Sequence, residues 1–158
     1  PLTGLLNRRI LDQVGQNLMD FEALPLNVGL ILIDIDLFKT INDRHGHLVG
    51  DRVIVAVAAA ILEICGANDL SARFGGEEFA IILATEDPHQ VEVLAENLRN
   101  TISKLNVPTD NPEALQFTVS IGASVGRRGK DEWDELFRAA DKALYRAKAM
   151  GRNRVCLS

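Results

Sequence analysis

The pattern of hydrophobic and polar residues predicts that helices and strands alternate along the whole chain. Apolar residues that recur at helical spacing indicate amphipathic helices, whereas short or nearly continuous apolar runs indicate strands buried in a sheet. The predicted helices cover residues 10–18, 50–65, 91–105 and 133–149. The predicted strands cover residues 27–36, 70–74, 79–83, 117–125 and 155–157. The run over 27–36 is the most apolar and ends in acid, which predicts a central strand buried on both faces.

This mixture of helices and strands predicts an α+β fold in one domain. A chain of 158 residues with 47% hydrophobic content is long enough to build one core. The polar stretches at 106–114 and 126–132 have the length of loops, and no repeat or internal linker interrupts the pattern. We therefore expect a single domain over 1–158. Because the chain opens at Pro1 and shows no signal-peptide pattern, we expect it to be excised from a longer protein.

Charge and cysteine content narrow the classes of function. The formal net charge of -5 argues against a nucleic-acid surface, which needs clustered Lys and Arg. The longest apolar stretches fall far short of the roughly 20 residues that span a bilayer, so we expect this segment to make no membrane contact. Cys65 and Cys156 stand in apolar contexts without a CxxC pattern. They are therefore predicted to be buried reduced thiols, which indicates a cytoplasmic location.

An acidic segment follows the predicted central strand. Asp34 and Asp36 are expected on one face of that strand, about 6–7 Å apart along the chain, and Lys39 follows closely. A lone aspartate at this place would more often cap the next helix. Two aspartates with a nearby lysine instead favour a metal-phosphate site. An EF-hand calcium loop is rejected because it needs further oxygen ligands and a glycine that this segment lacks.

A second acidic segment lies in a predicted hairpin turn. Gly75 and Gly76 suit the turn because glycine tolerates positive φ, and Glu77 and Glu78 follow directly. Two neighbouring glutamates on a turn are usually a solvated surface. If this hairpin lies beside the strand that carries Asp34, the carboxylates of Asp34 and Glu77 converge into a cluster able to hold magnesium on a triphosphate.

Ordered motifs give the chain a strong resemblance to the GGDEF family of diguanylate cyclases, which condense two GTP molecules into cyclic di-GMP. The motifs are LTGL with NRR at 2–9, DIDLFKTIND at 34–43, GHLVGD at 46–51, RFGGEEF at 73–79 and KALYRAKAMGRNRV at 142–155. They cover the whole chain in order. The resemblance implies a palm-like fold of βαββαβ type, in which a central, mainly antiparallel sheet is flanked by helices.

The resemblance also implies roles for the acidic residues. Asp34 and Glu77 would bind Mg²⁺ through their side chains, and Ile35 would add its carbonyl. Two ions would serve each active site, and Mn²⁺ is an alternative. Glu78 would help with the second metal or accept the proton of the 3′-hydroxyl, although Glu77 is an alternative base. The strand pattern ranks Asp36 equal to Asp34, whereas the family pattern gives the main role to the first aspartate.

Three basic residues are implied to hold the phosphates. Lys39 would stabilise negative charge on the phosphates in the transition state. Lys148 and Arg152 are four residues apart, so on a helix they would share a face and grip the β- and γ-phosphates. Taken alone, each of these residues would be an ordinary solvated charge.

Base choice is expected to come from Asn42 and Asp51, with His47 nearby. One carboxylate can accept hydrogen bonds from both N1–H and N2–H of guanine, and adenine offers no such pair. Asp51 therefore favours GTP over ATP. The competing interpretation of Asn42 and Asp51 is helix capping near Gly46 and Gly50. His47 is predicted to be a pocket wall or a structural hydrogen-bonding residue, not a catalytic base.

The implied reaction is in-line attack by the 3′-hydroxyl of one GTP on the α-phosphorus of another, carried out twice. Because the product is two-fold symmetric, catalysis is expected to need a homodimer of domains facing each other across an isologous interface. A regulatory N-terminal region of the full-length protein would hold the partners together.

The alternative function is a receptor for GTP or cyclic di-GMP without activity, which the unbroken acidic motif disfavours. A cyclase that makes a cyclic mononucleotide would share the metal site but not GGEEF.

A feedback site is implied to be degenerate. Many relatives carry an inhibitory product site with an Arg-x-x-Asp motif ending five residues before the GGEEF signature, and the matching window here runs from Gly66 to Asp69. Asp69 is retained, but Gly66 stands where the arginine would stack on and hydrogen-bond to guanine. We therefore expect weak product binding at this position.

Overall fold

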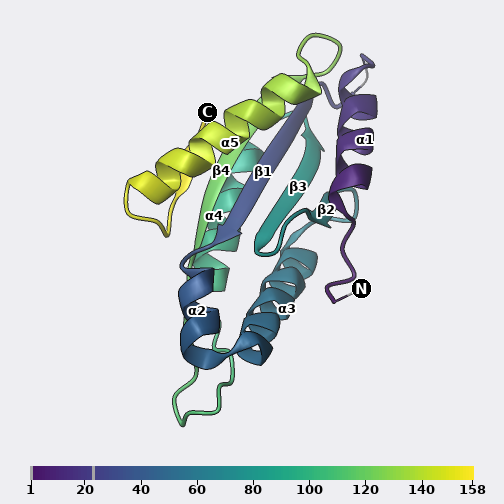
Figure 1. Cartoon of the computed structure of the whole chain (residues 1–158). Coiled ribbons are helices and arrows are strands. Elements are labelled where there is room, and N and C mark those ends of the chain that lie inside the picture. The colour runs from purple at the N-terminus through teal and green to yellow at the C-terminus, as the bar shows by residue number, and fades with distance from the viewer. Residues whose placement is uncertain (1, 23) are drawn as a thin grey trace.

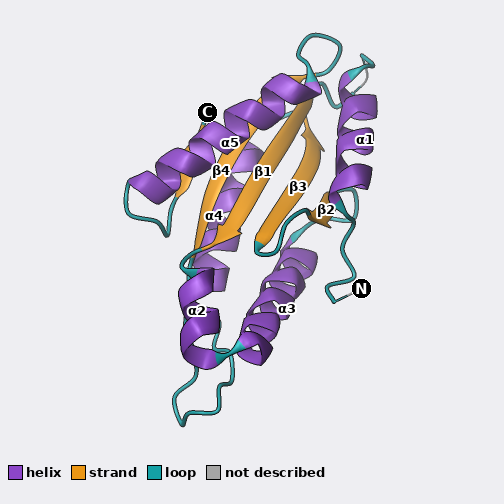
Figure 2. Cartoon of the chain, in the orientation of Figure 1, coloured by secondary structure: helices purple, strands orange, loops and turns teal. Residues whose placement is uncertain are grey.

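The computed structural model describes residues 2–22 and 24–158, so Pro1 lies outside the described residues. Helices and strands follow one another along the chain in an α+β arrangement (Figures 1 and 2). The elements are α1 (Arg8–Met19), β1 (Asn27–Ile35), α2 (Phe38–His45), α3 (His47–Ile64), β2 (Leu70–Arg73), β3 (Glu78–Thr85), α4 (His89–Ser103), β4 (Val119–Arg127), α5 (Trp133–Ala149) and β5 (Val155–Leu157).

The strands form one mixed sheet in the order β2-β3-β1-β4-β5. The strand β1 lies at the centre and is antiparallel to both β3 and β4, and β2 is antiparallel to β3. Only the pairing of β4 with β5 is parallel among the pairs of named strands described. Every residue of β1 after Asn27 is buried, as expected for an apolar run covered on both faces. The prediction of a central strand in a mainly antiparallel sheet is confirmed.

Alternation along β1 divides the hydrophobic core between the two faces of the sheet. Ile31, Ile33 and Ile35 join the cluster formed with α2, α3 and α4, whereas Leu30 and Leu32 join the cluster formed with α1 and α5. Successive side chains of a strand point to opposite faces, so this division follows from the period of two. The two groups of helices therefore cover opposite faces (Figure 1). Even-numbered positions at the end of β1 point to the side of α1 and α5.

The helix α2 is an element that the apolar pattern did not predict. It is short and contributes only Phe38 and Ile41 to the core, too few to show a helical period. It begins directly after Leu37, which has a left-handed φ of 54° and turns the chain away from the sheet. Two smaller differences concern β4, which extends two residues into the predicted loop at 126–132, and the cysteines, which are free but half-buried.

None of the helices in the described part of the chain combines the length and hydropathy of a membrane span.

Candidate active site

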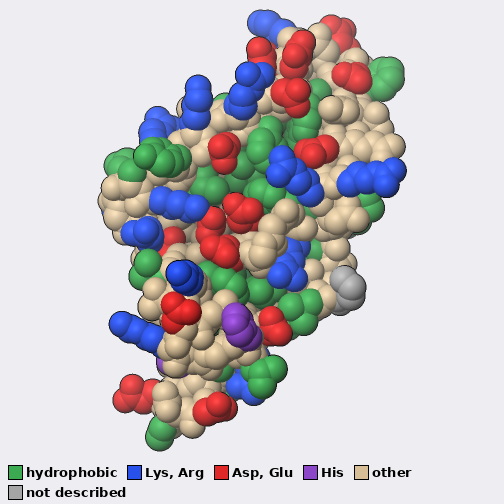
Figure 3. Space-filling view, viewed as in Figure 1, with side chains coloured by type: hydrophobic (Ala, Val, Ile, Leu, Met, Phe, Trp, Pro, Cys, Tyr) green, Lys and Arg blue, Asp and Glu red, His purple; other side chains and the backbone are tan. Residues whose placement is uncertain are grey.

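Acidic residues from two strands meet at one end of the sheet. The antiparallel register of β1 and β3 places Asp34 directly opposite Glu78. The amide of Ile35 donates a hydrogen bond to the carbonyl of Glu77 across 3.2 Å. The hairpin therefore lies beside the strand that carries Asp34, as the metal hypothesis requires. Figure 3 shows acidic side chains gathered near the middle of this face, with basic side chains beside them.

The pKa values of these carboxyl groups show that negative charge is concentrated here. Burial raises the pKa of Asp34, and Lys148 opposes the rise. Burial also raises the pKa of Glu77, and the charges of Asp34 and Glu78 raise it further. The pKa of Glu78 is raised by burial and by Asp34 and Asp141. Like charges at short range favour the binding of a cation between them.

Lys148 supplies a positive charge from the last turn of α5. Its Nζ lies 2.6 Å from Oδ2 of Asp34, whose side chain is almost fully buried. Lys148 also lowers the pKa of both glutamates, so it lies within electrostatic reach of the whole cluster. A lysine so placed is available to a phosphate that approaches the same carboxylates.

Arg152 does not share a helix face with Lys148, and that prediction is wrong. The helix α5 ends at Ala149, and Arg152 follows Gly151 in a loop with a left-handed φ of 64°. The amide of Arg152 donates to the carbonyl of Ala147 across 3.0 Å, the bond that closes a helix when glycine with positive φ follows it. Arg152 still lowers the pKa of Asp34, so the loop keeps it near the cluster.

The residues expected to select the base come from α2 and α3. Asn42 packs so closely on Gly50 that a Cβ on this glycine would overlap Oδ1 of Asn42. That Oδ1 is buried and has no hydrogen-bond partner among the described residues. His47 and Asp51 are exposed in the first turns of α3, and Lys39 is exposed on α2. A buried acceptor without a protein partner is rare, and a donor from a ligand or from an ordered water can satisfy it.

The helix-capping interpretation of Asn42 and Asp51 is wrong. The N-cap of α3 is Gly46, and no side chain caps that helix end. Asp51 lies inside the helix and Asn42 inside α2.

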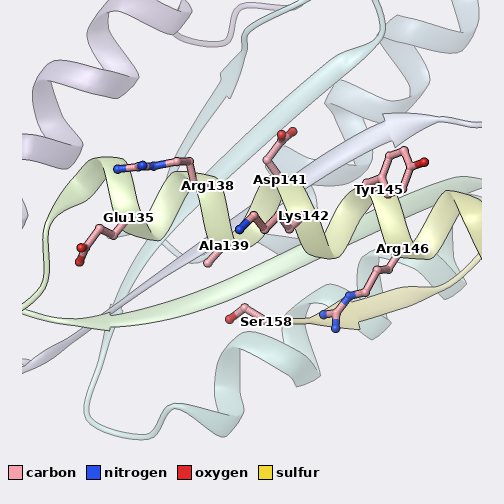
Figure 4. Close-up of a pocket in the computed structure, with 8 residues that line it drawn as sticks. All are labelled: Glu135, Arg138, Ala139, Asp141, Lys142, Tyr145, Arg146 and Ser158. Carbon is pink, nitrogen blue, oxygen red and sulfur yellow. The ribbon is translucent and has the colours of Figure 1, made fainter.

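A pocket of about 840 Å³ lies along the outer face of α5 (Figure 4). It is lined by Glu135, Arg138, Ala139, Asp141, Lys142, Tyr145, Arg146 and Ser158. Its charges are mixed, and none of the sequence-predicted site residues lines it. Only Asp141 among these residues influences the pKa of Glu78. The predicted metal and phosphate ligands therefore lie outside this pocket.

Comparison with known proteins decides the family. A family model described as "Diguanylate cyclase, GGDEF domain" matches residues 1–154. The chain belongs to the GGDEF family. Among curated relatives, this GGDEF domain is 41% identical over 157 residues to diguanylate cyclase DgcM of Escherichia coli K12, covering 98% of this chain and 37% of that protein. It is 38% identical over 159 residues to the uncharacterized protein YhcK of Bacillus subtilis, covering 99% of this chain and 44% of that protein. The chain thus spans less than half the length of these relatives.

Solved structures confirm the fold of the GGDEF domain. The GGDEF domain of DgcB from Caulobacter crescentus, solved in complex with c-di-GMP, superposes with a TM-score of 0.92 at 34% identity, covering 99% of this chain and 93% of that one. The active GGEEF domain of a diguanylate cyclase from Vibrio cholerae gives a TM-score of 0.88 at 32% identity, covering 97% of each chain. The predicted cyclase palm fold is therefore confirmed.

The residues at the acidic cluster of this GGDEF domain fit the divalent metal that the family implies. Carboxylate and carbonyl oxygens are the ligands that Mg²⁺ prefers, and Asp34, Ile35 and Glu77 offer both kinds. Among the described residues, no group of three His, Cys, Asp or Glu side chains is arranged to hold a metal ion. Mg²⁺ commonly uses one or two carboxylates together with substrate phosphates, so the cluster suits an ion that arrives with a nucleotide.

The residues from Gly66 to Asp69, where a degenerate product site is predicted, form a local turn. Oδ2 of Asp69 accepts a hydrogen bond from the amide of Gly66 across 2.7 Å, and the amide of Asp69 donates back to the carbonyl of Gly66 across 3.1 Å. The retained aspartate is thus already engaged within its own turn.

Asp36 has contacts that sequence reasoning did not find. Its carboxylate accepts hydrogen bonds from Thr118, Ser120 and Asn153. These partners lie 82 to 117 residues further along the chain, so no local pattern could have indicated them.

Proposed function

We propose that this GGDEF domain is a diguanylate cyclase that condenses two GTP molecules into cyclic di-GMP and two pyrophosphates. The observation that supports this most directly is the unbroken acidic cluster of Asp34, Glu77 and Glu78 at the end of the sheet, with Lys148 against it. A receptor without activity would have no need for two glutamates whose pKa values are raised by burial and by the charge of Asp34. The acidic cluster therefore favours the enzyme over the receptor.

In this proposal Asp34, Glu77 and the carbonyl of Ile35 hold the divalent metal, two Mg²⁺ ions per site, for which Mn²⁺ can substitute. The bound metal would supply Lewis acidity toward the reacting phosphate. Glu78 helps to hold the second metal or accepts the proton of the 3′-hydroxyl, and without metal its pKa is raised, chiefly by burial. Glu77 is the alternative base, since burial and its neighbours raise its pKa as well.

The basic residues orient the triphosphate. Lys148, which contacts Asp34 in the nucleotide-free domain, also binds a phosphate oxygen of GTP. Arg152 binds the triphosphate from the loop after α5. Lys39, exposed on the helix that follows β1, stabilises the charge that develops on the phosphates.

Guanine is bound between α2 and α3. The buried Oδ1 of Asn42 accepts one hydrogen bond from the base, and Asp51 accepts from N1–H and N2–H. His47 forms a wall of this pocket. Because adenine presents no matching pair of donors, the site prefers GTP over ATP.

Two domains are needed for one product molecule. Each 3′-oxygen forms a bond to the α-phosphorus of the opposite GTP, and the bond from that phosphorus to pyrophosphate breaks. The proton of each hydroxyl passes to a glutamate. We propose an isologous homodimer of domains in the cytoplasm, held by a regulatory N-terminal region of a longer protein.

Incubation with GTP and Mg²⁺, followed by chromatography of the products, tests this function. The domain is tested as a fusion to a dimeric coiled coil, because a monomeric domain would give no product even with an intact active site. The expected products are cyclic di-GMP and two pyrophosphates, lost when the metal is chelated. Tight GTP binding without any product from the fused dimer would contradict the enzyme and favour the receptor.

A further inference from the structure

Asp36 stands next to the metal cluster but has different partners from Asp34. It follows directly after β1 and is 7% exposed. Oδ1 accepts a hydrogen bond from Ser120 Oγ across 2.6 Å, and Oδ2 accepts from Thr118 Oγ1 across 2.6 Å and from the amide of Asn153 across 3.0 Å. Both carboxylate oxygens are therefore committed to donors of the protein, which offsets the cost of burying the charge.

The loop that Asp36 holds has an unfavourable backbone conformation. Arg152 and Asn153 have φ values of 64° and 45°, in the left-handed region that L-residues seldom adopt. Consecutive residues of this kind persist only where surrounding contacts hold them. The bond from the Asn153 amide to Asp36 is one such contact, and Arg99 Nη1 donates to Asn153 Oδ1 across 3.0 Å as a second.

This loop carries one of the basic residues assigned to the phosphates and follows the other. Lys148 lies in the last turn of α5, which ends at Ala149, whereas the loop includes Arg152 and leads into β5. The two acids of the strand thus contact one segment at two places, because Asp34 binds Lys148 and Asp36 binds Asn153. Removal of the second contact would free the loop while leaving the first in place.

We propose that Asp36 is a positioning residue for GTP binding and not a metal ligand. It fixes the loop over 150–154 so that Arg152 and Lys148 meet the triphosphate at the acidic cluster. This inference rests on the proposed function for the identity of the ligand, but the hold on the loop is independent of any activity.

Hydrogen–deuterium exchange of the nucleotide-free domain tests the hold on the loop. In Asp36→Ala, the amides over 150–154 should exchange at least about tenfold faster, because the Asn153 amide loses its acceptor. The matched control is Thr118→Val, which removes one hydrogen bond to the same carboxylate but leaves the Asn153 contact. Its loop should exchange as in the wild type. Equal exchange in wild type and Asp36→Ala would overturn the proposal even if the protein proved to be a cyclase.

Kinetics in the fused dimer separate positioning from metal binding. Asp36→Asn keeps the size of the side chain and serves as a second variant if the alanine variant does not fold. It is expected to raise KM for GTP several-fold while the half-saturating Mg²⁺ concentration stays unchanged. A rise in the Mg²⁺ requirement with KM unchanged would identify Asp36 as a metal ligand and overturn the proposal. If the wild type makes no product, the proposed function fails, and calorimetry with GTP supplies the affinity comparison instead. Equal GTP affinity of wild type and both Asp36 variants would then overturn the positioning role.

Discussion

Burial, and then the charge of neighbouring carboxylates, makes the charged forms of Asp34, Glu77 and Glu78 unfavourable in the folded protein. The pKa values of Asp34, Glu77 and Glu78 are raised on folding, so the folded state binds more protons than the unfolded state between the ordinary and the raised values. The free energy of unfolding therefore falls as pH rises through that window. At pH values above this window, a bound divalent cation should raise the free energy of unfolding again, because it neutralises the same negative charges.

Glu77→Gln should abolish turnover and leave the fold intact. At neutral pH the variant should be equally stable or slightly more stable than the wild type without metal, by less than about 1 kcal/mol because solvent screens a half-exposed group. This difference should vanish below the window in which the glutamate titrates. Thermal unfolding with and without Mg²⁺ measures the effect, and product formation measures activity. The matched control is Glu86→Gln, an exposed glutamate that follows the opposite end of β3. Wild-type rates of cyclic di-GMP formation in Glu77→Gln would exclude the metal assignment.

Gly50→Ala should weaken GTP binding without weakening the fold. The new methyl group would overlap Oδ1 of Asn42, and a flexible side chain can move away cheaply. Alanine also favours the helix by up to about 1 kcal/mol over glycine. We expect GTP affinity to fall roughly fivefold, the value of one hydrogen bond of about 1 kcal/mol, with a smaller effect on ATP. Asp51→Ala should shift the same GTP to ATP ratio in calorimetry. An unchanged ratio in both variants would show that neither residue contacts guanine.

Among the elements, α5 owes its position to a close approach to the central sheet. A Cβ on Gly122 in β4 would overlap the backbone of α5, with the Cα of Leu144 only 2.6 Å away. Only glycine lets the helix and the strand come this close. Lys148 lies in the last turn of the same helix, so the spacing between sheet and helix also sets the distance of the lysine from Asp34.

Gly122→Ala should therefore destabilise the domain by about 2 kcal/mol or more, because backbone atoms cannot rotate out of the way. Chemical denaturation measures the free energy of unfolding. Gly76→Ala is the matched control for stability, since a Cβ there meets nothing within 4 Å and no positive φ constrains the residue. Equal stability of the two variants would contradict the close packing of α5 on β4.

For the molecule as a whole, we expect product feedback to depend on the turn from Gly66 to Asp69 and not on the acidic cluster. The turn from Gly66 to Asp69 lies between α3 and β2, whereas Asp34 lies at the end of β1. Asp69 satisfies the amide of Gly66 within this turn, and glycine offers no guanidinium to a dinucleotide.

Calorimetric titration of cyclic di-GMP into the isolated domain should accordingly show weak binding, and turnover should continue as product accumulates. Low-micromolar binding that disappears in Asp69→Ala would prove that the site survives without its arginine. A second variant, Gly66→Arg, should strengthen product binding if the missing guanidinium is the only defect.

The sequence by itself determined the order of most elements, the central position of β1 and the family. A continuous apolar run can be stable only when both faces are covered, so burial of 27–36 follows from composition alone. Adjacent residues such as Glu77 and Glu78 stay together in any fold. The short helix α2 escaped prediction, because two apolar residues cannot establish a period.

Only the tertiary structure showed which partners each of the two similar aspartates has. Asp34 and Asp36 look alike in the sequence, but Lys148 reaches the first, while Thr118, Ser120 and Asn153 occupy the second. The place where α5 ends likewise separates Arg152 from the helix. The period of the apolar pattern predicts which residues are buried. It does not predict their hydrogen-bond and ion-pair partners, because these come from distant segments that strand pairing and helix packing bring together.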